Sequence, residues 1–564
     1  MFSLRWAVAV ALGLGLVACG PTPAAPPPAS EIKPAAPAPA AAPTGPEIDP
    51  FYTKPEQFGV EVPKTLGGTF RMAGNQGSDQ LDPYVGTLFV HQIIGEFVYD
   101  HIVDKRYAPN LNPLDPVTMC RLCTKWEQTD PKTYVFQLRQ NVKWHDGKPF
   151  SGEDIKFSLE RMADPKGGYN NRTNVLTLDK VEVSDPFTVK VTTNIPDADF
   201  LWKLFEVFII PKHVFDGGGS LTKQMVGTGP FKLKSYDQTT KAVYEKNKDY
   251  YVDGRPYLDG WEINFIPDKS TRLASLVAGQ IDFHTVNDKA EAEPLLRRNP
   301  NLQVQSFQAT LGNSLHMRQD KPPYNDIRLR KAIHLAVDRQ AMNQTLAFGG
   351  GIAVEAPKTS KFRPWSIPEE ELLKLPGWRQ PKDADIADAK RLLAELGFAG
   401  GFKTTGMTSA TNSSTPQMLE ALAGQLRTVG IDMEVQLQEP GVANKRYADG
   451  EFETVVWPSN AWMAPNRNYF DVRTGSPSNF YGISDPDLDK LIDQQAGLAD
   501  KEQRYKVLRQ IQQTLIDKMY VVPLIELNPQ SIWQPWLHNW RDQTRLAQPY
   551  VYGPIAEVLW LDKH

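Results

Sequence analysis

A helical pattern followed directly by a strand pattern recurs along this chain. Residues 415–429 place apolar side chains at helical spacing, Gly430 follows as a helix stop, and residues 431–437 alternate apolar and polar. An amphipathic helix is expected at 328–337, capped by Asn325-Asp326, and residues 488–525 contain two helical runs and an apolar strand. Such units build sheets covered by helices, so the sequence predicts a mixed α/β fold.

The stretch VKWHDGKPFSGEDIKFSLERM, residues 142–162, places a histidine beside an aspartate. Apolar residues alternate before it, and Asp146-Gly147 is a typical strand-ending turn. Ser151 with Asp154 predicts a capping box at the start of a helix. Since no nucleophile, second base or further metal ligand can be identified nearby, we interpret His145 as structural and not catalytic.

The N-terminus has the features of a lipoprotein signal peptide. A basic Arg5 precedes an apolar run at 7–16 that is too short to span a bilayer, and Leu16-Val17-Ala18-Cys19 has the form of a lipoprotein cleavage box. We therefore expect residues 1–18 to be removed and Cys19 to carry the lipid. An uncleaved membrane anchor and a cleaved signal without lipid are the weaker alternatives.

A proline- and alanine-rich segment follows Cys19 and extends to Pro50. It cannot bury a core and favours an extended polyproline conformation, so we interpret residues 19–63 as a tether. About thirty such residues would reach on the order of 90 Å at ~3.1 Å per residue.

Composition limits the classes of function. The formal net charge is -4, or -5 once Arg5 is removed with the signal peptide, and no basic stripe is present, which argues against a nucleic-acid ligand. The 564 residues are enough for two sizeable lobes, and no second long apolar run occurs.

The chain has three cysteines, of which Cys120 and Cys123 remain beside the lipidation site. A zinc site would need a second ligand pair, and thioredoxin-like redox chemistry would need the pair at the start of a helix in a small βαβ domain. A local disulfide in an oxidising compartment is favoured, with two free thiols as the alternative.

The stretch at 142–162 resembles the signature of the extracellular solute-binding proteins of family 5, the dipeptide and oligopeptide receptors of ABC importers. Further segments match that family in the expected order, from about residue 67 to about residue 525. They are LDPY at 81–84, VGTGPFKL at 226–233, GRPYLDGWEINFIPDKSTRLASLVAGQIDF at 254–283, YNDIRLRKAIHLAVDR at 324–339, AKRLLAELGF at 389–398 and VGIDMEVQL at 429–437.

The resemblance implies a two-lobed periplasmic-binding-protein fold of type II, in the large peptide-binding subclass, with a hinge between the lobes. It places lobe I at 64–270 plus 526–564 and lobe II at 271–525. It further implies a monomeric receptor in the cell envelope, on the periplasmic or extracellular face, which is tethered by its lipid and passes a small solute to ABC permease subunits. No catalysis and no cofactor are expected.

Two other classes of function are alternatives to a transport receptor. A secreted hydrolase acting on peptide or glycan would need paired acids in its cleft, and no recognisable pair can be identified. GxSxG, HExxH and phosphate-loop motifs are absent. The acids at 485–489 lack the glycine and glutamate of a calcium loop, so no metal site is predicted, and Ser484 with Asp487 is expected to cap a helix instead. A sensor or chaperone with the same fold is the remaining alternative.

The segment VVWPSNAWMAPNRNYF, residues 455–470, departs from the family pattern. In peptide receptors of the family the matching segment resembles W-x-x-D-x-x-D-P, and its first aspartate holds the α-ammonium of the peptide. Alignment of the prolines places Ala461 there, with Asn460 beside it, and the segment contains no Asp or Glu. Because a buried ammonium without a partner costs several kcal/mol, unblocked peptides should bind poorly unless another acid reaches the site.

Aromatic and amide side chains take the place of the missing acid. Trp457, Asn460, Trp462 and Asn466 suit a neutral ligand such as an oligosaccharide, although either tryptophan alone is equally compatible with a core position. The resemblance adds weaker candidates from segments that border the cleft in the family. They are Asn75, Ser78, Asn313, His316, Asn479 and Tyr481.

Overall fold

The computed structural model describes residues 51–562 except for 52–53, 64–65, 79, 86–93, 107–116, 168, 170–171, 287–288, 307–310, 362, 411–413, 461–463 and 541–551. The predicted signal peptide, the lipidation site at Cys19 and the Pro/Ala-rich segment therefore lie outside the described residues.

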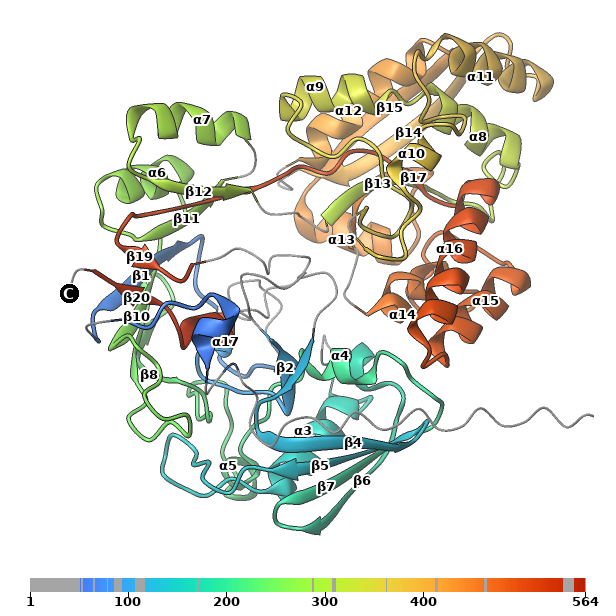
Figure 1. Cartoon of the computed structure of the whole chain (residues 1–564). Helices are drawn as coiled ribbons and strands as arrows, with labels where there is room; N and C mark the ends of the chain where they lie inside the picture. The colour runs from blue at the N-terminus through green and yellow to red at the C-terminus, as the bar shows by residue number, and fades with distance from the viewer. Residues whose placement is uncertain are drawn as a thin grey trace, which may run out of the picture. The chain divides into compact units, whose positions relative to one another are not determined.

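A seven-stranded sheet contains β1, which runs parallel to β10 and β11 (Figure 1). Helices α6 (Lys269–Val277) and α7 (Lys289–Arg298) pack against β11. In sheet order the strands are β12 (Gln303–Ser306), β18 (Gln530–Trp533), β11 (Phe283–Val286), β1 (Thr69–Gly74), β10 (Gly260–Phe265), β9 (Lys241–Lys246) and β8 (Phe231–Asp237).

A four-stranded antiparallel sheet contains, in order, β4 (Cys123–Asp130), β5 (Thr133–Leu138), β7 (Thr188–Thr193) and β6 (Leu178–Asp185). Helix α3 (Gly152–Ala163) packs against β6 and β7. It begins as predicted, since the Ser151 amide donates to the Asp154 carboxylate at 3.0 Å. Gly147 has a φ of 87°, as the preceding turn requires.

The strand pair β2 (Val103–Lys105) and β3 (Thr118–Cys120) adjoins β4. The structure contains the disulfide between Cys120 and Cys123 that the sequence favoured, with a Cα–Cα distance of 4.9 Å. The remaining short elements of this part are η1 (Pro55–Phe58), η2 (Arg172–Val175), α4 (Phe200–Leu204), α5 (Lys212–Asp216), β19 (Leu537–His538), α17 (Tyr552–Ala556) and β20 (Trp560–Leu561).

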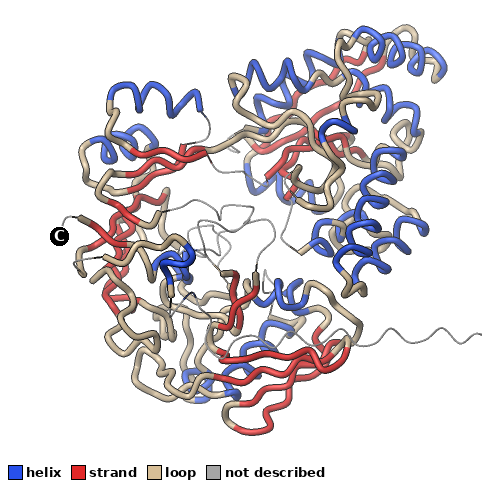
Figure 2. The backbone as a smooth tube through the Cα atoms, in the orientation of Figure 1, coloured by secondary structure: helices blue, strands red, loops and turns tan. Residues whose placement is uncertain are grey.

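A five-stranded sheet contains, in order, β15 (Ile431–Gln438), β14 (Phe402–Ser409), β16 (Thr454–Asn460), β13 (Leu311–Met317) and β17 (Val522–Pro523). Helices surround it (Figure 2). They are α8 (Ile327–Ala336), α9 (Arg339–Ala347), α10 (Glu369–Leu372), α11 (Asp383–Glu395), α12 (Thr415–Arg427), α13 (Pro440–Ala448), α14 (Pro465–Asn468), η3 (Phe470–Val472), α15 (Pro486–Ala496) and α16 (Lys501–Lys518).

The predicted helix-to-strand units are present in this part of the chain. The Asp326 carboxylate accepts from the Arg328 amide and caps α8, and α12 is followed by Gly430, with a φ of 92°, and then by β15. The cap of α15 is Asp485 and not Ser484, because the Asp485 carboxylate accepts from the amides of Asp487 and Leu488.

The predicted lobe boundary at 270/271 lies between strands of the seven-stranded sheet. Both β11 and β12 lie beyond residue 270, yet they belong to the seven-stranded sheet through β1 and β18. The chain changes sheets between β12 and β13 and returns between β17 and β18. Apolar alternation identifies a strand but cannot show which sheet it joins.

Part of the segment predicted as a tether, 19–63, packs into the folded part of the chain. Phe51 is fully buried against Phe58, and Val60 belongs to the same hydrophobic core. The backbone of Glu61 exchanges two hydrogen bonds of 2.8 Å with the Asn539 side chain. The apolar residues after Pro50 therefore belong to the folded part of the chain.

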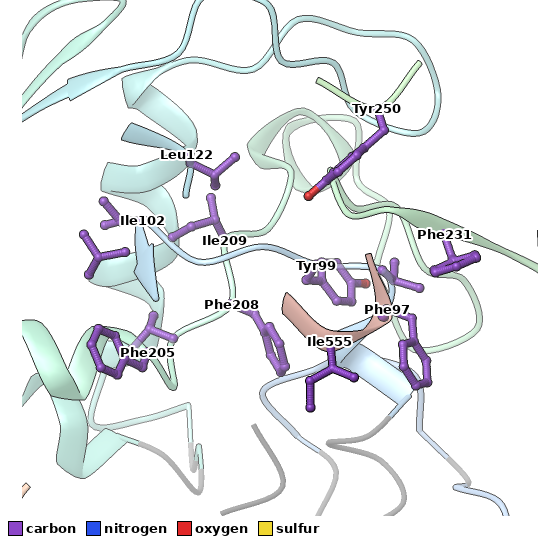
Figure 3. Close-up of a cluster of buried hydrophobic side chains, with 14 of the residues drawn as sticks. Phe97, Tyr99, Ile102, Leu122, Phe205, Phe208, Ile209, Phe231, Tyr250 and Ile555 are labelled. Atoms are coloured by element: carbon purple, nitrogen blue, oxygen red, sulfur yellow. The ribbon is translucent and has the colours of Figure 1, made fainter. Parts of the chain in front are cut away.

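The largest hydrophobic core joins side chains from distant parts of the sequence. Figure 3 shows Phe97, Tyr99, Phe208 and Phe231 gathered around Ile555, near the end of the chain. Burial of each large apolar side chain contributes roughly 1.5–3 kcal/mol, so the C-terminal segment adds to the stability of this core.

Candidate functional site

Three of the sequence-predicted residues meet beside the five-stranded sheet. Tyr447 of α13 stacks on Trp457 of β16, with ring centroids 4.4 Å apart and planes at 12°. The Tyr447 hydroxyl lies 2.6 Å from the Tyr481 hydroxyl, and Tyr481 stacks on His316 of β13 at 4.2 Å. We call Trp457, Tyr447, Tyr481 and His316 the aromatic cluster.

An ion pair lies against this aromatic cluster. The Lys358 ammonium is paired with the Asp471 carboxylate and lies 5.8 Å from the centre of the Tyr481 ring. The Tyr481 hydroxyl donates to the same carboxylate at 3.4 Å. The Asp471 carboxylate is therefore already bound to Lys358 and Tyr481.

His316 is a neutral ring within the cluster. It is 0% exposed, and neither ring nitrogen has a hydrogen-bond partner in the described part of the chain. Burial, together with the positive charge of Lys358, holds its pKa well below the ordinary value. His316 therefore contributes an aromatic surface and no charge at neutral pH.

A small cavity of about 20 Å³ adjoins the aromatic cluster. Its walls come from β13, from residues 355–359 and from residues 523–526. Ser314 and Lys358 connect it to the cluster, since Ser314 pairs with Trp457 across β13 and β16. Asn313, a predicted ligand contact, also lines the cavity and donates to the Ile525 carbonyl at 3.5 Å.

Two acidic residues that sequence reasoning missed, Glu355 and Glu526, line the same cavity. Glu526 is 2% exposed, and Glu355 is partly buried. Burial raises the pKa of Glu355 to about 7, although the Lys361 amide donates to it at 2.6 Å and Glu526 acts on it as a hydrogen-bond partner. A glutamate directly after the apolar run VVPLI was the available sequence signal for Glu526.

The polar groups of Asn466 form hydrogen bonds with other residues of the protein. Its backbone amide donates to Asp199 at 2.7 Å and its side-chain amide to Asp197 at 3.2 Å, while its side-chain oxygen accepts from Arg504 at 3.3 Å and also from Gln495. Asn466 thereby connects α14 with the residues that precede α4.

Two further candidates stabilise local turns. The Asn479 side chain bonds the backbone of Arg473 and Ile483, and the Ser78 hydroxyl donates to the Gln80 carbonyl at 2.7 Å.

The remaining predicted ligand contacts lie at strand ends or outside the described residues. Asn75 is exposed at the end of β1. Asn460 ends β16 opposite Leu311, and only its backbone is described, while Ala461 and Trp462 lie outside the described residues.

His145 has a structural role. Its Nε2 atom lies 3.0 Å from the Gly229 carbonyl oxygen, its Nδ1 accepts from the Gly227 amide at 3.4 Å, and burial lowers its pKa to about 4. In the described ranges no group of three His, Cys, Asp or Glu side chains could hold a metal ion. No helix of those ranges has the length and apolar character needed to span a bilayer.

Comparison with known families identifies the class of protein. The profile described as bacterial extracellular solute-binding proteins, family 5 Middle, matches residues 119–481. The chain belongs to this family. It is an extracytoplasmic substrate-binding protein of an ABC importer, a transport receptor and not an enzyme.

Relatives of this family 5 protein are named for different ligands. Heme-binding protein A of Haemophilus influenzae is 27% identical over 502 residues, which cover 81% of this chain and 85% of that protein. Glutathione-binding protein GsiB of Salmonella paratyphi A is 30% identical over 315 residues, or 55% of this chain and 59% of that protein.

Solved structures show the same fold. The oligopeptide-binding protein AppA from Bacillus subtilis, in complex with a nonapeptide, has a TM-score of 0.72 and 20% identity, over 88% of this chain and 100% of that chain. DppA from Helicobacter pylori, in complex with the peptide STSA, has a TM-score of 0.72 and 23% identity, over 90% and 100%. The predicted α/β periplasmic-binding-protein fold is thereby confirmed.

Proposed function

We propose that this substrate-binding protein is a lipid-anchored receptor for a small organic solute that presents an uncharged surface to residues 455–470. One observation carries the proposal. The segment has no acid, and the first acid after it, Asp471, is already paired with Lys358 and Tyr481.

The energetics disfavour the α-ammonium of a short peptide at this segment. An ammonium that loses water without gaining a counter-charge costs several kcal/mol, and Asp471 could serve only by leaving Lys358 unpaired. The partly buried Trp457, backed by Tyr447, offers a flat apolar surface with hydroxyl groups nearby, which suits stacking of an uncharged ring. A relative named for heme supports a ligand with a flat apolar body.

The proposal also includes a lipid anchor at Cys19 and delivery of the solute to the membrane transporter. Leu16 to Cys19 supports lipidation, and the Pro/Ala-rich segment after it is long enough to let a tethered receptor reach its transporter. The partners are then ABC permease subunits, and the receptor works as a monomer. Lobe I comprises the elements up to β12 and the C-terminal segment from β18, and lobe II comprises β13 to β17.

Calorimetric titration with an unmodified tripeptide tests the ligand class. We expect no binding in the micromolar range, because the amino terminus finds no counter-charge at residues 455–470. Micromolar or tighter binding would return the protein to the ordinary peptide receptors of its family.

A further inference from the structure

Lobe I and lobe II touch at a place that is distant in sequence from the two chain crossings between their sheets. Lobe I contributes α4 and the residues beside it, and lobe II contributes α14 to α16. The Ala198 amide donates to the Ala496 carbonyl at 3.0 Å, and the Asn466 amide donates to the Asp199 carboxylate at 2.7 Å. We call this contact the lobe junction, and it comprises residues 197–206 and 466–504.

Two ion pairs of the same polarity cross the lobe junction. Asp199 lies 2.5 Å from Arg504, and Glu206 lies 2.6 Å from Arg467. In both pairs the acid belongs to lobe I and the arginine to lobe II. The four side chains are between 0% and 18% exposed, so water screens these charges only weakly. The lobes therefore carry complementary charge where they meet.

An amide and an indole ring also fit both sides of the junction. The Asn174 side-chain amide donates to Glu206 at 3.0 Å, and its oxygen accepts from Arg467 at 3.3 Å. The side chain of Trp202 in α4 packs against the main hydrophobic core of lobe I and against a core of lobe II. Apolar packing across the junction is an observation independent of the ion pairs.

We propose that the lobe junction is a latch, which forms when the lobes close and separates when they open. Proteins of this fold close around a ligand by hinge motion, so a contact between the lobes outside the crossings at β12–β13 and β17–β18 has to break on opening. The proposal takes its lobes from the proposed function and does not depend on the class of ligand.

The latch shares a segment with the proposed ligand surface. Asn466 and Arg467 belong to residues 455–470, which also contain Trp457. A ligand shifts an equilibrium toward the state that it binds better. A solute held by Trp457 in the closed form therefore also favours the contacts of Asn466 and Arg467 with lobe I. Release of that solute to the permease requires both ion pairs to separate.

Hydrogen-exchange mass spectrometry of the full chain, without added solute, measures whether the junction opens. The reporters are the amides of Ala198 and Asn466, one from each lobe, and strand amides of β5 and β14 report on unfolding of the two lobes. We expect both reporters to exchange together and faster than the strand amides. Exchange of the reporters only together with the strands, or of one reporter alone, would overturn the latch.

Charge variants test the role of the ion pairs. Glu206→Gln and Arg467→Met each break one pair and leave a buried charge that faces an uncharged side chain. Because breaking a buried pair from one side is costly, each change should speed exchange of both reporters at least about tenfold. The double variant removes both charges and should exchange more slowly than either single variant. Arg473→Met, the matched control, breaks an exposed pair with Asp493 within lobe II and should leave both reporters unchanged.

Three results with these variants would overturn the latch. They are unchanged exchange in both single variants, equal acceleration by Arg473→Met, and a double variant that exchanges as fast as the single variants. If the single variants fail to fold, the order of exchange in the unmodified protein decides. No ligand is used in these measurements, so the latch can fail while the tripeptide test of the proposed function succeeds, and the reverse.

Discussion

At the scale of single residues, Trp457 is the side chain on which the proposed ligand surface depends most. Replacing it with Ala should weaken binding of the transported solute by roughly 1–3 kcal/mol, as for other aromatic anchors. Phe at the same position should retain most of the affinity because it keeps a ring against Tyr447. The measurement is calorimetry with the solute identified by mass spectrometry of the purified protein, and an unchanged affinity of the Ala variant would remove Trp457 from the site.

His316 permits a prediction about pH and stability. Its pKa is depressed in the folded protein, so the unfolded chain binds the extra proton, and stability falls as the pH drops below about 6.5. His316→Phe should reduce this loss and keep or raise stability at pH 7 by about 1 kcal/mol, because two unpartnered ring nitrogens are removed. Urea unfolding at pH 5 and 7 checks this, and an unchanged pH dependence would contradict it.

The residue types in the sequence do not show which side chains lie together in the candidate site. The sequence predicts His316 and Tyr481 because their segments border the cleft in the family, and Trp457 because it offers aromatic surface where the family has an acid. Tyr447, which links them, comes from α13. Glu355 and Glu526 approach one another only because residues 352 and 526 pair as an isolated bridge. Amides such as that of Asn466 looked available in the sequence, although the fold occupies all of their polar atoms.

At the scale of elements, local signals predicted the helices and strands well. The capping pair at Ser151, the Asp326 cap and the stop at Gly430 all depend on neighbouring residues, and each was found in the structure. Sheet membership depends on distant pairing, as between β11 and β18, which no local pattern contains. This difference explains why the fold class could be predicted from the sequence and the sheet that β11 and β12 join could not.

The contact between α16 and the residues before α4 gives an element-scale prediction. Arg504 lies 2.5 Å from Asp199, and both side chains are buried. Asp199→Ala should lower the free energy of unfolding by about 3–5 kcal/mol, because it leaves a buried guanidinium without its carboxylate. Asp493→Ala breaks an exposed pair with Arg473 and should cost at most about 1 kcal/mol. Urea unfolding measures both, and equal effects would contradict the stabilising role of the buried pair.

At the scale of the whole molecule, the proposed lipid anchor depends on Cys19 near the N-terminus. Cys19→Ala should leave the precursor uncleaved or release the protein from the membrane fraction, because no thiol remains to carry the lipid. Fractionation and mass spectrometry of the N-terminus distinguish these results from the unmodified protein. A processed, membrane-bound Cys19→Ala variant would show that lipidation is not the anchor.

Calorimetry with trialanine and with its N-acetylated form tests most directly whether the receptor binds a free amino terminus. Residues 455–470 contain no acid, and Asp471 is paired with Lys358, so we predict no micromolar binding of trialanine. N-acetylation should then cause no loss of affinity. Micromolar or tighter binding of trialanine that disappears on N-acetylation would contradict the account, because it would show that the amino terminus finds a counter-charge in this receptor.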